Sequence, residues 1–230
     1  MPIDTLWLNV VIAALWLVLV GGLAFVVDRA TPPGTEWTRK VLHIGTGNII
    51  LIAWWLNIPA WVGIGSAVMF TGVSIASYAL PLLPSVNNIG RRSWGTCFYA
   101  ISIGVLVAWF WPLQMPSLAA LGILVMTWGD GLAGLIGKRF GKHRYQVMGM
   151  TKSWEGTATM GIVSFIVSLA MLWPGCANPF VASAIALTVA LFATLLESFS
   201  KLGIDNLTVP IGSSALAYGL IRLFCLNLLP

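Results

Sequence analysis

Long stretches without a charged side chain are the feature that most restricts how this chain can fold. Four such blocks contain 23, 50, 37 and 41 residues and occupy positions 5–27, 41–90, 93–129 and 156–196. A helix needs about 20 predominantly apolar residues to cross the hydrocarbon core of a bilayer. The first block therefore has room for one crossing helix, and each of the others has room for two. Because 58% of all residues are hydrophobic, we predict a polytopic integral membrane protein.

Prolines divide the long blocks, because proline interrupts a helix. They occur near the middle of each long block, at Pro59, Pro112 and Pro174, and a last apolar run begins at Val209. We therefore predict an all-α fold, a single domain over residues 1–230, about eight transmembrane helices and no separate soluble domain. An alternative with seven helices makes one of the shortest spans re-entrant. The predicted helices cover approximately residues 5–27, 41–56, 60–83, 95–111, 116–136, 157–173, 179–197 and 209–229.

Basic residues predict the orientation of these helices. Eleven of the twelve Lys and Arg lie in loops 28–40, 84–94, 137–156 and 198–208, with Arg222 as the exception. Because positive loops stay on the cytoplasmic side, we expect these four loops there and both termini on the opposite face. The same rule explains the basic excess, so no nucleic-acid partner is expected.

The start of the chain is expected to be a transmembrane helix. The apolar run from Thr5 to Val27 is longer than a signal-peptide core and follows no basic residue. No Ser- and Arg-rich transit segment precedes it, so a bacterial inner or photosynthetic membrane is the expected location. The three cysteines, Cys97, Cys176 and Cys225, lack metal-ligand spacing and are expected to be packing residues.

Residues 129–157, GDGLAGLIGKRFGKHRYQVMGMTKSWEGT, gather seven of the chain's charged residues. Glycines let backbone N–H groups approach phosphate oxygens, lysine neutralises phosphate charge, and aspartate or glutamate holds Mg²⁺. If Thr157 begins a helix, the residues before it lie at an N-terminus that favours anions. We therefore predict an active-site loop here. A second interpretation is a loop kept polar only to set the topology.

Three segments carry a resemblance to a known family. The pattern GD-x-x-AG-x-x-G-x-x-x-G followed by KSWEGT resembles the CTP-dependent polyprenol kinases, in particular their short phytol-kinase-like members from phototrophs. RKVLHIGTG at 39–47 and DNLTVP at 205–210 match two further segments of that family. The resemblance spans residues 39–210, and KSWEGT is its most specific element.

The resemblance implies a membrane enzyme that phosphorylates a long-chain isoprenoid alcohol, with phytol as the expected substrate. CTP is the expected donor, Mg²⁺ the expected metal, and CDP the expected second product. Nucleotide would enter from the cytoplasm and the alcohol from the lipid bilayer. The implied catalytic residues are Asp130, Lys152, Glu155 and His43. The implied nucleotide-binding residues are Arg39, Lys40, Gly134, Gly137, Lys138, Gly141, Lys142, Ser153, Gly156 and Thr157. The implied metal ligands are Asp130, Glu197, Asp205 and Asn206.

Several of these residues have simpler interpretations. Glu197 is four residues before Lys201, a spacing at which the two side chains pair on a helix. Glu155 is suited to the first turn of a helix, and Lys152 to the membrane interface. A single histidine in a helix is often a structural residue, and this is the alternative to a site role for His43.

Two other functions fit part of the pattern. A cytidylyltransferase or CDP-alcohol phosphotransferase also combines acidic metal sites with cytidine nucleotides. The chain lacks a D-G-x-x-A-R motif, however, because Asp130-Gly-Leu-Ala is followed by Gly134. A transporter would place charges in the middle of its spans, whereas these charges gather at one face.

Overall fold

The chain folds almost entirely into helices, which confirms the all-α prediction. The structure, a computed structural model, describes residues 3–32, 36–79 and 94–225. Its helices are α1 (Ile3–Ala30), α2 (Trp37–Gly47), α3 (Ile49–Trp55), α4 (Ala60–Ala79), α6 (Gly95–Phe110), α7 (Pro116–Leu124), α8 (Gly131–Phe140), α9 (Trp154–Leu172), α10 (Pro179–Ser198) and α11 (Asp205–Phe224).

Six helices in the described part of the chain are long and apolar enough to cross a membrane. The other two predicted spans are shorter: 95–111 is the 16-residue α6, and 41–56 is divided between α2 and α3. These lengths fall below the roughly 20 residues that a simple span needs, so the predicted count of eight is not established. The six spans are Ile3–Ala30, Ala60–Ser77, Pro116–Phe140, Trp154–Gly175, Pro179–Ser198 and Asp205–Phe224.

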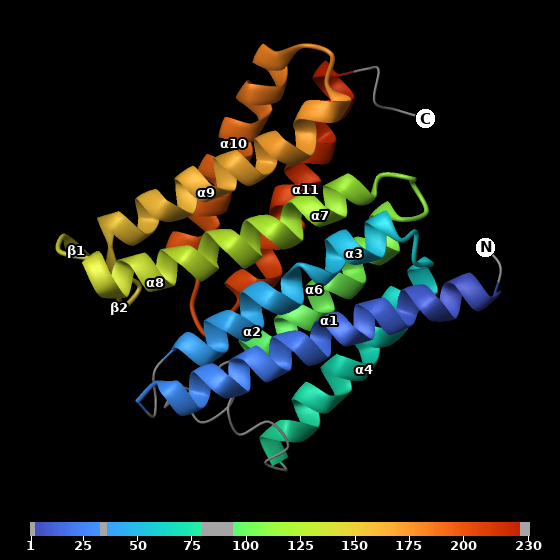
Figure 1. Ribbon diagram of the computed structural model, residues 1–230. Helices are drawn as coiled ribbons and strands as arrows, with labels where there is room; N and C mark the ends of the chain where they lie inside the picture. Colours follow the sequence, from blue (N-terminus) through green and yellow to red (C-terminus); the bar gives the residue numbers. More distant parts are fainter. Residues whose placement is uncertain (1–2, 33–35, 80–93, 226–230) are drawn as a thin grey trace.

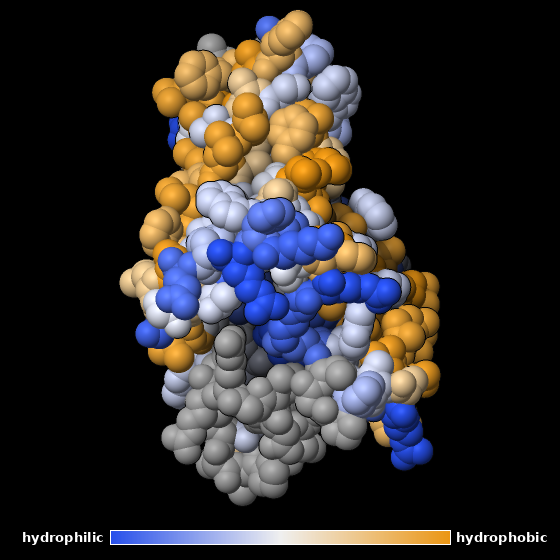
Figure 2. Space-filling view, turned by 90° about the vertical axis from the view of Figure 1, so that its left-hand side faces the viewer, coloured by the Kyte–Doolittle hydropathy of each residue, from blue (hydrophilic) through white to orange (hydrophobic). Residues whose placement is uncertain are grey.

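The outer surface has the character expected of lipid-facing helices. Large apolar side chains along α1, α4, α9 and α10 are exposed, among them Leu19, Val68, Ile162 and Leu191. Hydrophilic residues gather instead at one end of the molecule, which Figure 2 shows facing the viewer. The molecule therefore has one polar end and apolar sides.

A central helix supports that polar end. The segment α7 to α8 runs between α9 and α11 on one side and α1 to α3 on the other (Figure 1). Its residues Leu121, Ile123 and Val125 are fully buried. Gly122 permits close packing, because a Cβ there would lie 2.2 Å from the carbonyl oxygen of Pro210 on α11.

The segment 129–157 is ordered rather than an open loop, which corrects the prediction. A π-helical turn, Val125–Asp130, joins α7 to α8, and the antiparallel strands β1 (Arg144–Val147) and β2 (Met150–Ser153) follow. Helix α9 begins at Trp154, three residues before the predicted start. Single π-helical turns are rare and occur frequently at functional sites.

Two cysteines form a disulfide. Cys176 follows α9 and Cys225 follows α11, and their sulfurs are bonded across a sequence separation of 49 residues. The prediction that all three cysteines are packing residues was therefore wrong for these two, whereas Cys97 is free and buried. Spacing along the chain could not reveal the pair, because α9 and α11 are brought together by packing against α10.

Candidate active site

A pocket of about 360 Å³ lies at the polar end, between α2, α8, the hairpin and the start of α9. The end of α10 also contributes to its wall. Most of the residues implied by the family resemblance line this pocket. They are Arg39, Lys40, Asp130, Gly134, Gly137, Lys138, Lys152, Ser153, Gly156, Thr157 and Glu197.

Lys40 and Asp130 form an ion pair on one wall of the pocket. The Nζ atom of Lys40 lies 2.7 Å from Oδ2 of Asp130 and also donates to the backbone carbonyl of Asp130 at 2.9 Å. The Lys40 side chain is only 4% exposed. Gly134 leaves space for it, since a Cβ there would lie 2.9 Å from both Cε and Nζ of Lys40.

Lys152 and Glu197 form a second ion pair. Nζ of Lys152 on β2 lies 2.5 Å from Oε1 of Glu197, and it also donates to the backbone carbonyl of Glu197 at the end of α10. The alternative pairing of Glu197 with Lys201 is therefore not the one that the structure shows. The local i,i+4 spacing predicted the wrong lysine because β2 brings Lys152 to α10 from 45 residues away.

Glu36 is a pocket residue that the sequence analysis missed. Its carboxylate accepts hydrogen bonds from Arg39 and Lys138, both at 2.6 Å. Burial acts to raise the pKa of Glu36, but the hydrogen bonds from Arg39 and Lys138 outweigh it and lower this pKa from 4.5 to about 2. The sequence could have suggested the pair of Glu36 and Arg39, because these residues are three positions apart. It could not have suggested the pair of Glu36 and Lys138, which are 102 positions apart.

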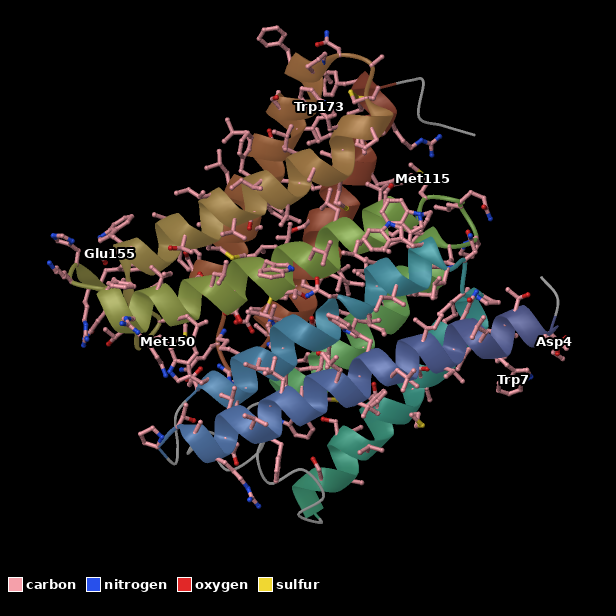
Figure 3. The ribbon with its side chains drawn as sticks, viewed as in Figure 1. Asp4, Trp7, Met115, Met150, Glu155 and Trp173 are labelled. Atoms are coloured by element: carbon pink, nitrogen blue, oxygen red, sulfur yellow. A yellow bond between two sulfur atoms is a disulfide. The ribbon has the colours of Figure 1, made fainter. Side chains whose placement is uncertain are left out.

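Glu155 does not line the pocket. Its Oε1 accepts hydrogen bonds from the backbone N–H groups of Lys142 and His143 at 3.1 Å, and lies 2.8 Å from Nδ1 of His143. Figure 3 shows Glu155 at the outer end of the molecule, beside the hairpin. Glu155 and Lys142 therefore stabilise the connection between α8 and β1, and the structure does not bring them to the pocket.

His43 lies behind Asp130, outside the pocket lining. Its ring stacks on Tyr99 at 4.6 Å, and its Nε2 lies 3.4 Å from the carbonyl oxygen of Met126 and 3.7 Å from Oδ2 of Asp130. The structure thus places His43 where it supports the position of Asp130.

Two of the backbone donors at the start of α9, where an anion site was predicted, are already hydrogen-bonded within the protein. The N–H of Trp154 donates to the carbonyl of His143 at 2.9 Å, and the N–H of Gly156 donates to Oγ of Ser153 at 3.1 Å. The groups of this pocket that can attract an anion are therefore its cationic side chains.

The glycines of the motif serve helix packing. A Cβ on Gly156 would lie 3.0 Å from the carbonyl oxygen of Ala133, and one on Gly141 would lie 2.7 Å from Cβ of Ser153. Gly137 faces Gly156 across the same contact. These glycines let α8 and α9 approach closely and bring the walls of the pocket together.

Comparison with known proteins identifies the family. The chain is 51% identical over 213 residues to phytol kinase of Synechocystis, and the alignment covers 93% of this chain and 91% of that protein. The chain belongs to the phytol-kinase-like polyprenol kinases. No protein-family model matches it, and no solved structure matches it.

Plant members of this kinase family are more distant. Phytol kinase 1, chloroplastic, of Arabidopsis thaliana is 29% identical over 79% of this chain and 65% of that protein. Farnesol kinase, chloroplastic, of the same plant is 25% identical over 59% of this chain and 47% of that protein.

The pocket of this kinase-family chain carries the charges that an anionic ligand needs. Its described lining has more basic than acidic side chains, so the pocket is net positive. The basic residues are Arg39, Lys40, Lys138, Arg144 and Lys152, and the acidic residues are Glu36, Asp130 and Glu197.

The carboxylates of Asp130 and Glu197 are better suited to a metal ion that a bound nucleotide also coordinates than to a metal ion held by protein ligands alone. Each lysine bonds one oxygen of Asp130 or Glu197, which leaves the second oxygen of each carboxylate for a metal. Among the described residues, no group of three or more His, Cys, Asp or Glu is arranged to hold a metal. Mg²⁺ is commonly held by one or two carboxylates together with substrate phosphates, so the residues fit it in that way.

Asp205 and Asn206 lie at the start of α11, outside the pocket lining. Asn206 donates to Oδ1 of Asp205 from its backbone at 3.0 Å and from its side chain at 3.1 Å. Asp205 is close enough to Asp130 and Glu197 to interact with both electrostatically. Asp205 is therefore near the site, although neither residue lines the pocket.

Proposed function

We propose that this protein phosphorylates phytol, with CTP as the phosphoryl donor and Mg²⁺ as the metal. The observation that supports this most is the net-positive pocket, in which two lysine–carboxylate pairs lie at the polar end of a membrane protein that is 51% identical to a phytol kinase. The products are the isoprenyl monophosphate and CDP.

The proposed transfer forms one covalent bond and breaks one. The hydroxyl oxygen of the alcohol forms a bond to the γ-phosphorus, the bond between that phosphorus and the β–γ bridging oxygen breaks, and CDP leaves. Such transfer depends on positioning and charge neutralisation. Bound Mg²⁺ would supply part of that neutralisation, with Asp130 and Glu197 as its protein ligands.

Different residues of the pocket are assigned to the nucleotide and to the alcohol. Arg39, Lys138, Arg144 and Lys152 present cations to the phosphates, where charge develops during transfer. Asp130 is the carboxylate nearest Lys40, and we assign it to orient the hydroxyl and accept its proton. Glu155 and His43 are less suited to contact the hydroxyl, because neither lines the pocket.

We further propose that the pocket faces the cytoplasm of a bacterial inner or photosynthetic membrane. The disulfide supports this independently of the basic loops. It lies beyond the end of α9, whose 19 residues extend about 28 Å from the hairpin. Disulfides persist in oxidising compartments, which supports the assignment of the opposite end, with its pocket, to the cytoplasm.

Labelled nucleotide tests the proposal against a cytidylyltransferase. Purified protein is given phytol with CTP labelled at either the γ- or the α-phosphorus. We expect γ-label in an isoprenyl monophosphate and α-label in water-soluble CDP. Label from the α position in the lipid product would overturn the kinase assignment. A parallel panel of ATP, GTP and UTP tests CTP as the donor, and a titration with EDTA and Mg²⁺ tests the metal.

A further inference from the structure

A second cavity, of about 290 Å³, lies between α1, α2 and α8, and its lining is almost wholly apolar. Leu19 and Leu23 form one wall from α1, Val41 and Ile44 form the facing wall from α2, and Leu135 contributes from α8. Leu19 and Leu23 are 60% and 51% exposed, so this groove opens toward the hydrocarbon of the bilayer.

Lys40 lines both this groove and the polar pocket. Its ammonium group bonds Asp130 on the polar side, whereas a lysine stem is a hydrocarbon chain that packs well against apolar surface. The groove therefore ends at the ion pair where the proposed reaction takes place.

The walls of the groove are fixed. A Cβ on Gly45 would lie 2.5 Å from Cγ1 of Val20, so α1 and α2 are in close contact beside the groove. The indole N–H of Trp16 also donates to the carbonyl of Gly45 at 2.8 Å. The groove is therefore formed by the direct packing of α1 against α2.

We propose that this groove binds the hydrocarbon chain of the alcohol substrate and presents its hydroxyl to Lys40 and Asp130. The inference rests on the proposed function, and it adds the binding site of the isoprenoid chain. A hydroxyl can accept a hydrogen bond from Lys40 and donate one to Asp130. The side chain of Lys40 is only 4% exposed, so this end of the groove suits a single hydroxyl better than a phospholipid headgroup.

Photolabelling tests the site without turnover. Full-length protein in lipid nanodiscs is incubated with a C20 isoprenoid alcohol that carries a diazirine in its chain, with no nucleotide present. We expect crosslinks in residues 16–23 of α1 and 41–44 of α2, reduced at least tenfold by excess phytol and unchanged by excess phosphatidylglycerol. Crosslinks elsewhere, or competition by the phospholipid as strong as that by phytol, would overturn the proposal.

A pair of variants provides the kinetic test. Leu19→Trp narrows the groove, and Val18→Trp adds the same bulk at the neighbouring position, which is 70% exposed and does not line the groove. We expect Leu19→Trp to raise KM for a C20 alcohol about tenfold, with less effect on a C10 alcohol and none on KM for the nucleotide. Equal effects of the two variants would contradict the assignment.

The two proposals can fail separately. If no nucleotide supports phosphorylation but phytol-sensitive labelling of α1 and α2 persists, the proposed function fails and the groove remains an alcohol site. If phosphorylation is normal but labelling misses these helices, the groove assignment fails alone.

Discussion

At the scale of single residues, the structure pairs each key carboxylate of the pocket with a cation. Lys40 holds Asp130, Lys152 holds Glu197, and Glu36 joins Arg39 to Lys138. Lys40 is buried, and removing the partner of a buried charge leaves that charge uncompensated, which costs roughly 3–5 kcal/mol. The pairs of Glu36 contribute less, because Arg39 and Lys138 are 39% and 63% exposed. Variants of Lys40 and Asp130 are therefore expected to affect folding as well as the proposed catalysis, and experiments must separate the two effects.

The double variant of Lys40 and Asp130 makes that separation. We expect Asp130→Asn alone to lower kcat at least 100-fold and also to reduce stability, because Lys40 loses its partner. Adding Lys40→Met removes the unpaired charge, so the double variant should regain thermal stability in detergent while staying inactive. Recovery of activity in the double variant would show that Asp130 is structural. Thermal unfolding and γ-label transfer measure the two properties.

Glu36 predicts a dependence of stability on pH. Folding lowers the pKa of Glu36 from its usual 4.5 to about 2, so the folded state favours the ionised carboxylate. Its contribution to stability is therefore complete above about pH 4.5 and is lost as the pH falls toward 2. We expect Glu36→Gln to lower the unfolding temperature at pH 7 but to have little effect near pH 2. A difference that is constant across this range would contradict the prediction.

At the scale of elements, glycines decide how closely α8 approaches its neighbours. Gly137 and Gly156 allow α8 to pack against α9. Gly134 leaves space for the side chain of Lys40 on α2. The π-helical turn before α8 ends at Asp130, which lies beside Lys40. The elements thus bring together two motifs that are far apart in the sequence.

Gly134→Ala tests this arrangement. The new Cβ would lie 2.9 Å from the flexible end of Lys40, so the fold should survive while the ammonium moves away from Asp130. We expect activity to fall at least tenfold, with a smaller loss of thermal stability than in Asp130→Asn, because both charges of the pair are still present. Gly65→Ala is the matched control, because nothing lies within 4 Å of a Cβ at that helical position. Equal activity of both variants would show that the position of Lys40 is unimportant.

At the scale of the whole molecule, the polar pocket and the disulfide mark opposite ends. The hairpin lies at one side in Figure 1, whereas the start of α1 and the end of α11 lie away from it. Figure 3 places Trp173, at the end of α9, far from Glu155 at its beginning. The two ends of the protein therefore meet different compartments if the spans cross the bilayer as proposed.

Thiol labelling tests this orientation. A membrane-impermeant maleimide should label Cys176 and Cys225 only after reduction, and only from the non-cytoplasmic side. His143→Cys, in the connection before β1, should react only from the cytoplasmic side. The measurement compares intact cells with inverted vesicles, and the single variants Cys176→Ser and Cys225→Ser assign the signal. Labelling of both ends from the same side would contradict the proposed topology.

The sequence by itself determined the membrane class, most helix positions and most residues of the pocket. These features are local: apolar blocks set the helices, and the motif beginning at Asp130 and ending in KSWEGT carries the resemblance. The comparison with the Synechocystis kinase confirmed the family inferred from those segments. The helix starts at Trp154 and Asp205 were missed by three and four residues, because polar residues at helix ends obscure the apolar pattern that predicts a span.

Only the tertiary structure decided which side chains meet. Lys40 and Asp130 are 90 positions apart, and Glu36 and Lys138 are 102 apart, so no local pattern could pair them. The disulfide and the apolar groove between α1 and α2 are likewise products of helix packing. The physical reason is that hydrophobicity and charge along a chain determine where helices form. Which helices become neighbours depends instead on how closely their surfaces can pack.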